Sequence, residues 1–206
     1  MAGMTADGGS SGVFRILHVC TGNVCRSPYA EILTRHLLGE RLGADALRFE
    51  IASAGVGAVV GCGMHPDSRS ELAPWGLDGP AADSFVARQL EPSLLAGTDL
   101  VLGATTGHRS EIVKLAPRSL PVAFSLREFA RLAASVDPAA LPDDAVERAG
   151  ELVKLARAQR GMASVAPDAD QVPDPIGRSA AVHRQAAALM HEAVAAIVDA
   201  LAPRSR

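Results

Sequence analysis

Short apolar segments alternate with amphipathic segments along the first two thirds of this 206-residue chain. The first apolar segment, 14–20, reads FRILHVC, is broken by Gly22 and Asn23, and is typical of a buried strand. Strands that alternate with helices predict a parallel sheet covered by helices on both faces, with its site at the carboxyl ends of the strands. The predicted strands are 14–20, 47–54, 99–104 and 120–124, and the predicted helices between them are 28–38, 66–75 and 107–115.

After the fourth strand the pattern becomes helical. The segment 143–160 carries apolar residues at the spacing of one helix face, whereas 164–178 is rich in Pro, Asp and Gly and is typical of a loop. We expect 1–12 to be a flexible tail and 13–206 to form one domain, with a helical insertion at about 125–165. The predicted helices of this half are 126–134, 143–160 and 178–201.

Charge and composition exclude several classes of protein. Lys and Arg number 20 against 23 Asp and Glu, so the net charge of −3 offers no basic face for nucleic acid. The longest stretch without charge, 51–65, is too short and too rich in glycine to span a membrane, and 1–12 lacks the features of a signal peptide. Three cysteines do not form a disulfide framework, so we expect a protein of the reducing cytoplasm.

The segment 20–28, CTGNVCRSP, joins the first predicted strand to the first predicted helix. A short loop that leads into a helix N-terminus directs several backbone N–H groups inward and forms a site for an anion. Arg26 adds a planar, bidentate group for phosphate oxygens, and Cys20 facing this positive site is a nucleophile at neutral pH. Ser27 can donate its hydroxyl to the Cys20 sulfur. The spacing alone also fits a buried cysteine followed by a solvated arginine.

The stretch VCTGNVCRSPYAE resembles the signature of the low-molecular-weight protein-tyrosine phosphatases. The resemblance extends from Phe14 to the last helix. It implies a three-layer α/β/α fold with a central four-stranded parallel sheet of flavodoxin-like topology, to which the helical segment at about 125–165 is an addition. Further matching segments are Ser53-Ala54-Gly55, Ala87-Arg88-Gln89-Leu90, Asp99-Leu100-Val101-Leu102 and Asp174-Pro175.

The resemblance implies a phosphatase that transfers the phosphoryl group first to Cys20 and then to water. Arg26 and the backbone amides of 21–26 would hold the phosphate oxygens, and Asp174 would act as general acid and then as general base. No metal ion and no cofactor are implied. The residues assigned to phosphate binding are Thr21, Gly22, Asn23, Val24, Cys25, Arg26 and Ser27.

Two of these assignments have alternatives. Asp168 and Asp170 compete with Asp174 for the role of the acid, and an Asp-Pro pair is also ordinary turn chemistry. The resemblance suggests that Cys25 forms a reversible disulfide with Cys20, which protects the nucleophile from further oxidation. Cys25 also fits the description of a small buried hydrophobic residue.

The other cysteine and the histidines carry no catalytic role in this interpretation. Cys62 has no evident partner, and His65 reads as the entry to a helix. His18 is expected in the core or at its edge, whereas His183 and His191 are expected on the surface of the last helix. The spacing of Cys and His along the chain is not that of a zinc site.

The chain departs from the family pattern in three places. Ile176-Gly177 follows the Asp-Pro pair where many members carry an aromatic pair, and 56–64 contains no aromatic residue. The third strand ends in Ala104-Thr105 instead of Met-Asp. The first two departures weaken the expectation of phosphotyrosine selectivity, and the third weakens the expected support of the phosphate loop.

The expected function is hydrolysis of phosphotyrosine or a similar aryl phosphate, with a phosphorylated protein or a small phosphate ester as partner and no oligomeric state implied. Val24 favours this function over phosphoarginine hydrolysis, because phosphoarginine phosphatases carry Thr there. A thioredoxin-coupled arsenate reductase is an alternative, but its relay needs two further cysteines and none follows Cys62. A non-catalytic phosphate-binding regulatory module is another, which the presence of Cys20 and Asp174 disfavours.

Overall fold

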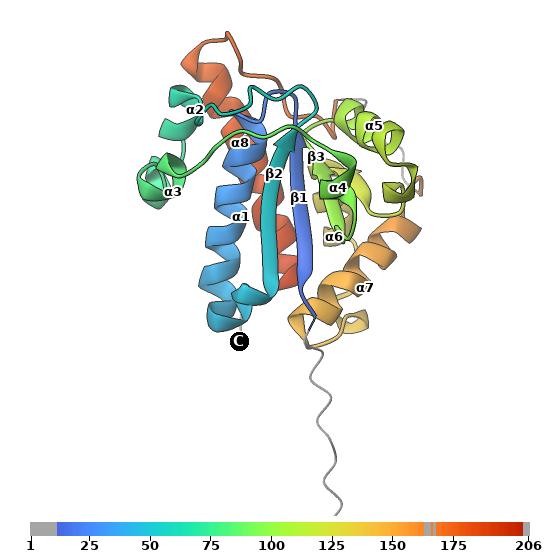
Figure 1. The fold of residues 1–206 in the computed structure, drawn as a ribbon. Helices are drawn as coiled ribbons and strands as arrows, with labels where there is room; N and C mark the ends of the chain where they lie inside the picture. Colours follow the sequence, from blue (N-terminus) through green and yellow to red (C-terminus); the bar gives the residue numbers. More distant parts are fainter. Residues whose placement is uncertain (1–11, 163–165, 167, 204–206) are drawn as a thin grey trace, which may run out of the picture.

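The fold is built on a parallel sheet of four strands in the order β2-β1-β3-β4 (Figure 1). The computed structural model describes residues 12–162, 166 and 168–203. Most of the predicted tail, 1–11, therefore lies outside the described residues. The strands confirm the predicted α/β class and are β1 (Phe14–Cys20), β2 (Phe49–Gly55), β3 (Leu100–Gly103) and β4 (Ala123–Ser125).

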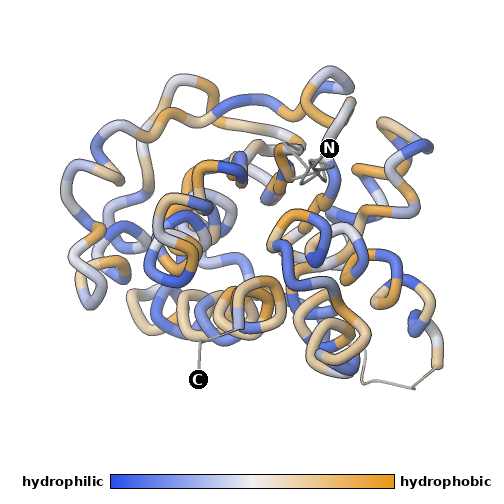
Figure 2. Tube along the Cα trace, turned by 90° about the horizontal axis from the view of Figure 1, so that it is seen from below, coloured by the Kyte–Doolittle hydropathy of each residue, from blue (hydrophilic) through white to orange (hydrophobic). Residues whose placement is uncertain are grey.

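Both faces of the sheet are buried, which explains why its strands are almost continuously apolar. On β1, Ile16 and Cys20 belong to the larger core, whereas Leu17 and Val19 belong to the core of the opposite face. Orange apolar and blue hydrophilic segments alternate along the helices (Figure 2), as expected for helices that rest one face on a sheet. The larger core is formed with α1 (Arg26–Leu42), α6 (Leu126–Ala134), α7 (Ala145–Ala158) and α8 (Ala180–Leu201), and the smaller core with α4 (Pro92–Leu95) and α5 (Thr106–Leu115).

The strand order places the functional loop. The chain passes from β1 to β2 on one side and then returns to place β3 on the other side of β1. The direction of winding therefore reverses between β1 and β3, and the loops at their carboxyl ends separate there. The loop after β1 lies at this switch point, at the upper end of the sheet in Figure 1.

The three helices predicted after the fourth strand are all present, and their observed bounds lie within two residues of the predicted ones. Helix α6 begins with a capping box, in which Ser125 and Glu128 each accept a backbone N–H of the other. Asp144 caps α7 by accepting from the N–H groups of Val146 and Glu147. These two helices and η4 (Pro138–Ala140) occupy the segment expected to be an insertion, and its status as an addition to the family pattern stays a prediction.

Several predicted boundaries were wrong. Helix α1 begins at Arg26, two residues before the predicted start at Pro28. Pro28 lies within the first turn, where a backbone N–H finds no acceptor inside the helix, so the N–H that proline lacks costs no hydrogen bond. The predicted helix 66–75 is divided into α2 (Pro66–Ser70) and η2 (Ala73–Trp75), since Pro74 also lacks an N–H. The predicted strand 120–124 begins only at Ala123. No apolar period in the sequence predicted the remaining short elements, which are η1 (Gly43–Arg48), α3 (Pro80–Asp83), α4 and η3 (Pro117–Ser119).

Within the described ranges, none of the helices combines the length and apolar character needed to cross a bilayer.

Replacement of Phe124 by Ala tests the larger core. The ring is fully buried, meets Phe129 edge-on at 5.0 Å between centroids, and lies 4.0 Å from the Arg160 guanidinium. We expect Phe124→Ala to lower the free energy of unfolding by about 3–5 kcal/mol, because it leaves a cavity in a packed interior. Urea denaturation at pH 7 measures this change. The control Leu47→Ala, at a side chain that is 86% exposed, should change it by less than about 0.5 kcal/mol; equal effects would contradict the description of the core.

Candidate active site

The loop between β1 and α1 is held in shape by Asn23. Its φ of 55° is the only positive φ of a non-glycine residue in the described part of the chain, and Asn adopts this region more readily than most residues. The buried Asn23 amide donates to the Ser27 and Ser53 hydroxyls, each at 2.8 Å, and its oxygen accepts from the Arg88 backbone N–H at 2.9 Å. The loop therefore keeps a fixed form before any ligand binds.

The backbone after β2 supports the same loop. The N–H groups of Val56, Gly57 and Val59 donate at 3.0 Å to the carbonyls of Cys20, Thr21 and Gly22. These bonds direct three loop carbonyls toward the backbone that follows β2. A Cβ at Gly55 would collide with the Thr21 carbonyl, so this close approach requires glycine.

Cys20 ends β1 with its side chain almost fully buried, at 2% exposure. Its Sγ lies 3.0 Å from Ser27 Oγ. Since Asn23 already donates to Ser27 Oγ, the Ser27 hydroxyl proton can point toward the sulfur or toward the Ala54 carbonyl at 3.4 Å. In the first orientation it stabilises a thiolate. The predicted contact between Ser27 and Cys20 is confirmed.

Arg26, in the first turn of α1, is 4% exposed and points toward the segment that precedes α8. Its Nη2 donates to Asp174 Oδ2 at 2.6 Å and to Thr21 Oγ1 at 3.3 Å, and its Nη1 donates to the Val172 carbonyl at 3.3 Å. The Nε–H is buried and has no hydrogen-bond partner among the described residues. A buried cationic donor without a partner favours an anionic ligand at this position.

These side chains line a cleft of about 230 Å³. Asp174 enters it with a half-exposed side chain, while Val59 and Ile176 form aliphatic walls. The structure thus brings together the three predicted catalytic residues and most of the predicted phosphate-binding loop. Asn23 and Ser27 are different, because they lie buried under the loop and hold it rather than line the cleft. The cleft is lined by Cys20, Thr21, Gly22, Val24, Cys25, Arg26, Gly57, Val59, Asp174 and Ile176.

The two alternatives to Asp174 lie elsewhere. Asp170 is buried and forms an ion pair with Arg131 at 3.1 Å, and Asp168 is exposed. Neither side chain lines the cleft. Asp174 is therefore the carboxylate of this segment that the fold brings to Arg26.

His108 is a site residue that the sequence analysis missed. Its Nε2 lies 3.0 Å from Thr21 Oγ1, and its Nδ1 lies 2.7 Å from Thr105 Oγ1. Burial, and then the charge of Arg26, lower the pKa of His108 to about 4, so the ring is neutral at pH 7. Thr105 belongs to the Ala104-Thr105 pair that departs from the family pattern. Through His108 it nevertheless supports the phosphate loop. No sequence motif joins Thr21 to a histidine 87 positions away.

One of the predictions for the histidines was wrong. His183, expected on the surface, is 1% exposed and bonds through Nδ1 to Ser68 Oγ at 2.8 Å; α8 packs this face against α2, which the helical spacing alone did not reveal. His18 is buried as expected, lies 3.1 Å from Thr34 Oγ1, and has its pKa lowered to about 3 by burial and then by Arg35.

The cysteines other than Cys20 differ in their surroundings. Cys25, at the N-cap of α1, is 2% exposed, and burial raises the pKa of its thiol to about 11. Cys62 is exposed, and both are free thiols in this structure. A disulfide between Cys20 and Cys25 stays a prediction. His65 caps α2 through its side chain, which confirms its expected place at a helix entry.

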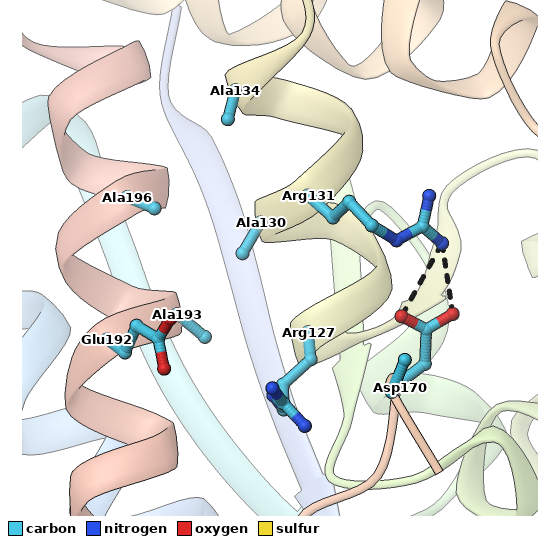
Figure 3. Close-up of a pocket in the computed structure, with 9 residues that line it drawn as sticks. Arg127, Ala130, Arg131, Ala134, Asp170, Glu192, Ala193 and Ala196 are labelled. Atoms are coloured by element: carbon cyan, nitrogen blue, oxygen red, sulfur yellow. Dashed lines mark hydrogen bonds and ion pairs between the residues drawn. The ribbon is translucent and has the colours of Figure 1, made fainter. Parts of the chain in front are cut away.

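A second cavity of about 340 Å³ lies between α6 and α8 (Figure 3). Ala130 and Ala193 face each other across it, and Arg127 and Glu192 stand at one end. Arg131 is turned toward Asp170 and bound to it. This cavity shares no lining residue with the cleft at Cys20.

The fold and the cleft together define the class of cysteine-based phosphatases, in which a sulfur nucleophile lies in a phosphate loop at the switch point of a parallel sheet. Residues 15–154 match the family described as low molecular weight phosphotyrosine protein phosphatase. The chain belongs to this family. Asp174 lies beyond the matched residues.

Relatives and solved structures support this membership. A low molecular weight protein-tyrosine-phosphatase of Streptomyces coelicolor is 37% identical over 134 residues, which are 64% of this chain and 74% of the relative. A protein-arginine-phosphatase of Geobacillus stearothermophilus is 34% identical over 116 residues, 56% of this chain and 71% of the relative. The structure of the arginine phosphatase YwlE from the same organism superposes with a TM-score of 0.62 at 25% identity, covering 90% of this chain and 91% of that one.

The protonation of His108 predicts how stability depends on pH. Its pKa of about 4 in the folded chain lies below the ordinary value of 6.5. Between these values the unfolded chain binds a proton that the folded chain does not, so stability falls as the pH falls. We expect wild type to lose about 1.4 kcal/mol more per pH unit than His108→Gln between pH 6.5 and 4. Urea midpoints across this range measure the difference, and parallel curves would show the assignment to be wrong.

Proposed function

We propose that this phosphatase hydrolyses phosphotyrosine or a similar aryl phosphate monoester through a phosphocysteine formed on Cys20. The observation that carries this proposal is the buried Arg26 guanidinium, which lines the same cleft as Cys20 and has an Nε–H without a hydrogen-bond partner among the described residues. A phosphate dianion in the cleft would satisfy that donor and the N–H groups of the loop at once.

In the first step, the Cys20 thiolate attacks phosphorus, a sulfur–phosphorus bond forms, and the bond from phosphorus to the phenolic oxygen breaks. The charge of the transition state gathers on the equatorial oxygens. Arg26 and the amides of 21–26 meet these oxygens with fixed dipoles, so little reorganisation accompanies the reaction. Ser27, at 3.0 Å from the sulfur, stabilises the thiolate both before attack and as the leaving group of the second step.

Asp174 supplies the proton for the departing phenolic oxygen. In the structure its carboxylate is 2.6 Å from Arg26 Nη2, a contact that holds the acid at the cleft. A bound phosphate competes for the guanidinium, and Asp174 then becomes available to the leaving group. In the second step the same carboxylate takes a proton from the water that attacks phosphocysteine, and phosphate and the Cys20 thiolate are released.

The side chains that form the walls of the cleft influence which substrate binds there. Val59 and Ile176 are about half exposed, and both present aliphatic surface to the entrance. Such walls cover a phenyl ring by apolar contact but lack the stacking of an aromatic wall. They support aryl phosphates with modest affinity for the ring.

Phosphoarginine is the second candidate substrate, because one relative and one solved structure bear the name of an arginine phosphatase. Val24 favours the aryl ester, since its side chain offers no hydroxyl to a guanidinium. An arsenate reductase with a cysteine relay has no support in the chain, which contains no cysteine after Cys62. The retained Cys20, Arg26 and Asp174 disfavour a module that only binds phosphate.

We further propose that the substrate is met in the cytoplasm, as a phosphorylated protein or a small phosphate ester. Three cysteines, two of them buried free thiols, suit a reducing compartment.

Hydrolysis of p-nitrophenyl phosphate and phenyl phosphate by purified variants tests the mechanism. We expect Cys20→Ser to abolish turnover of both substrates. We expect Asp174→Asn to lower kcat about 10²–10⁴-fold for phenyl phosphate, and less for p-nitrophenyl phosphate, because nitrophenolate leaves without a proton. Inorganic phosphate should still bind to Asp174→Asn.

Asp168→Asn is the matched control, because it removes a carboxylate of the same segment that does not line the cleft. It should keep wild-type kcat. Full turnover by Cys20→Ser would refute the mechanism, and equal losses on the two substrates in Asp174→Asn would refute the role of the acid.

Replacement of the aliphatic wall tests the substrate. We expect Ile176→Phe to lower KM for phenyl phosphate several-fold with little change in kcat, because a larger apolar surface contacts the ring away from the reacting atoms. Steady-state kinetics with phosphotyrosine and phosphoarginine peptides separate the two candidates. A higher kcat/KM for phosphoarginine, rising further in Val24→Thr, would contradict the proposal of an aryl ester.

A further inference from the structure

Three side chains with metal-binding atoms meet beside the base of the phosphate loop. Cys25 occupies the N-cap position of α1, His65 caps α2, and His183 lies in the first turn of α8. The Cys25 sulfur and one nitrogen of each imidazole all lie within 4.8 Å of one another. The two rings are stacked, with centroids 4.7 Å apart. Elements from three separate parts of the chain thus present one thiol and two imidazoles to a common point.

The hydrogen bonds of His183 favour a ligand at this point. The ring is 1% exposed, and Nδ1 bonds to the Ser68 hydroxyl at 2.8 Å. Its Nε2 is buried and has no hydrogen-bond partner of normal geometry among the described residues, while the Pro175 carbonyl and the Asp67 carboxylate act on the ring as acceptors. A buried polar atom without a partner is costly. One nitrogen of His183 is therefore available, while the other is already oriented by Ser68.

We propose that Cys25, His65 and His183 bind a zinc ion. One thiolate and two neutral imidazoles form a donor set of the borderline-soft kind that Zn²⁺ prefers over Mg²⁺ or Ca²⁺. On binding, the Cys25 thiol loses its proton to solvent and a sulfur–zinc bond forms, with no change in oxidation state.

Zinc binding requires two local changes. His65 must give up the Asp67 N–H that its Nδ1 now accepts at 3.3 Å, because a neutral imidazole accepting at Nδ1 carries its proton on Nε2. The donor atoms must also close around the ion. Zinc bonds are about 2.3 Å to sulfur and about 2.0–2.1 Å to imidazole nitrogen, so the donor atoms must approach one another from their present separation. Asp67, whose Oδ2 lies 3.9 Å from His183 Nε2 in an exposed side chain, is placed to supply the fourth ligand. Ser68 would then act as the outer partner that fixes the His183 ring.

A metal ion here would join the base of the phosphate loop to α2 and α8. It would also occupy the Cys25 sulfur, which would then be unavailable to Cys20 for a disulfide. The inference does not rest on the proposed substrate or on the role of Asp174.

The test uses the full chain carrying Cys20→Ser and Cys62→Ser, without a histidine tag, so that Cys25 is the only thiol. Isothermal titration with Zn²⁺ should give one ion per chain, and Zn²⁺ should raise the melting temperature, because the folded state alone presents the three ligands together. Co²⁺ in the same site should give a thiolate-to-cobalt charge-transfer band. Adding Cys25→Ser should remove that band.

In that background, His65→Ala and His183→Gln should each weaken Zn²⁺ binding about tenfold or more. His65→Ala is the safer variant, since this side chain is only partly buried. His191→Ala, which changes a histidine of the same helix outside the cluster, is the matched control and should bind as tightly as its parent. Absence of Zn²⁺ binding, a cobalt complex without the charge-transfer band, or unchanged affinity in His65→Ala would each overturn the proposal.

Discussion

The structure of the site depends on the hydrogen bonds of one buried amide. Asn23 holds a left-handed backbone conformation and bonds to the end of β2, to the backbone N–H of Arg88 and to the first turn of α1. These bonds fix the direction of the loop amides and the position of Ser27. Since the loop lies where the winding of the sheet reverses, its N–H groups face an open cleft rather than a neighbouring strand.

The positive charge of the cleft comes from the protein itself. Arg26 is buried, and its guanidinium is held by Asp174, Thr21 and the Val172 carbonyl. His108, in α5, bonds to Thr21 as a neutral ring, so it adds no second charge near Arg26. An anion can therefore replace the Asp174 contact while the remaining supports stay in place. Anion binding at Arg26 would therefore free the Asp174 carboxylate.

Sequence reasoning predicted the four strands and most of the longer helices, because each depends on a local period of apolar residues. It erred where proline set a boundary, as in the division of 66–75 into α2 and η2. It placed His183 on the surface, because a helical pattern shows which faces are apolar but not which neighbour covers a polar residue. The burial of that ring follows from the packing of α2 on α8.

The sequence by itself determined the positions of Cys20, Arg26 and the loop between them, since these residues are consecutive and one short loop positions them. Only the tertiary structure distinguished Asp174 from Asp168 and Asp170, because the path of the chain before α8 decides which carboxylate reaches Arg26. It also decided the contact of His108 with Thr21 and the meeting of one cysteine with two distant histidines. Such contacts join residues far apart in the chain, and only the packing of separate elements creates them.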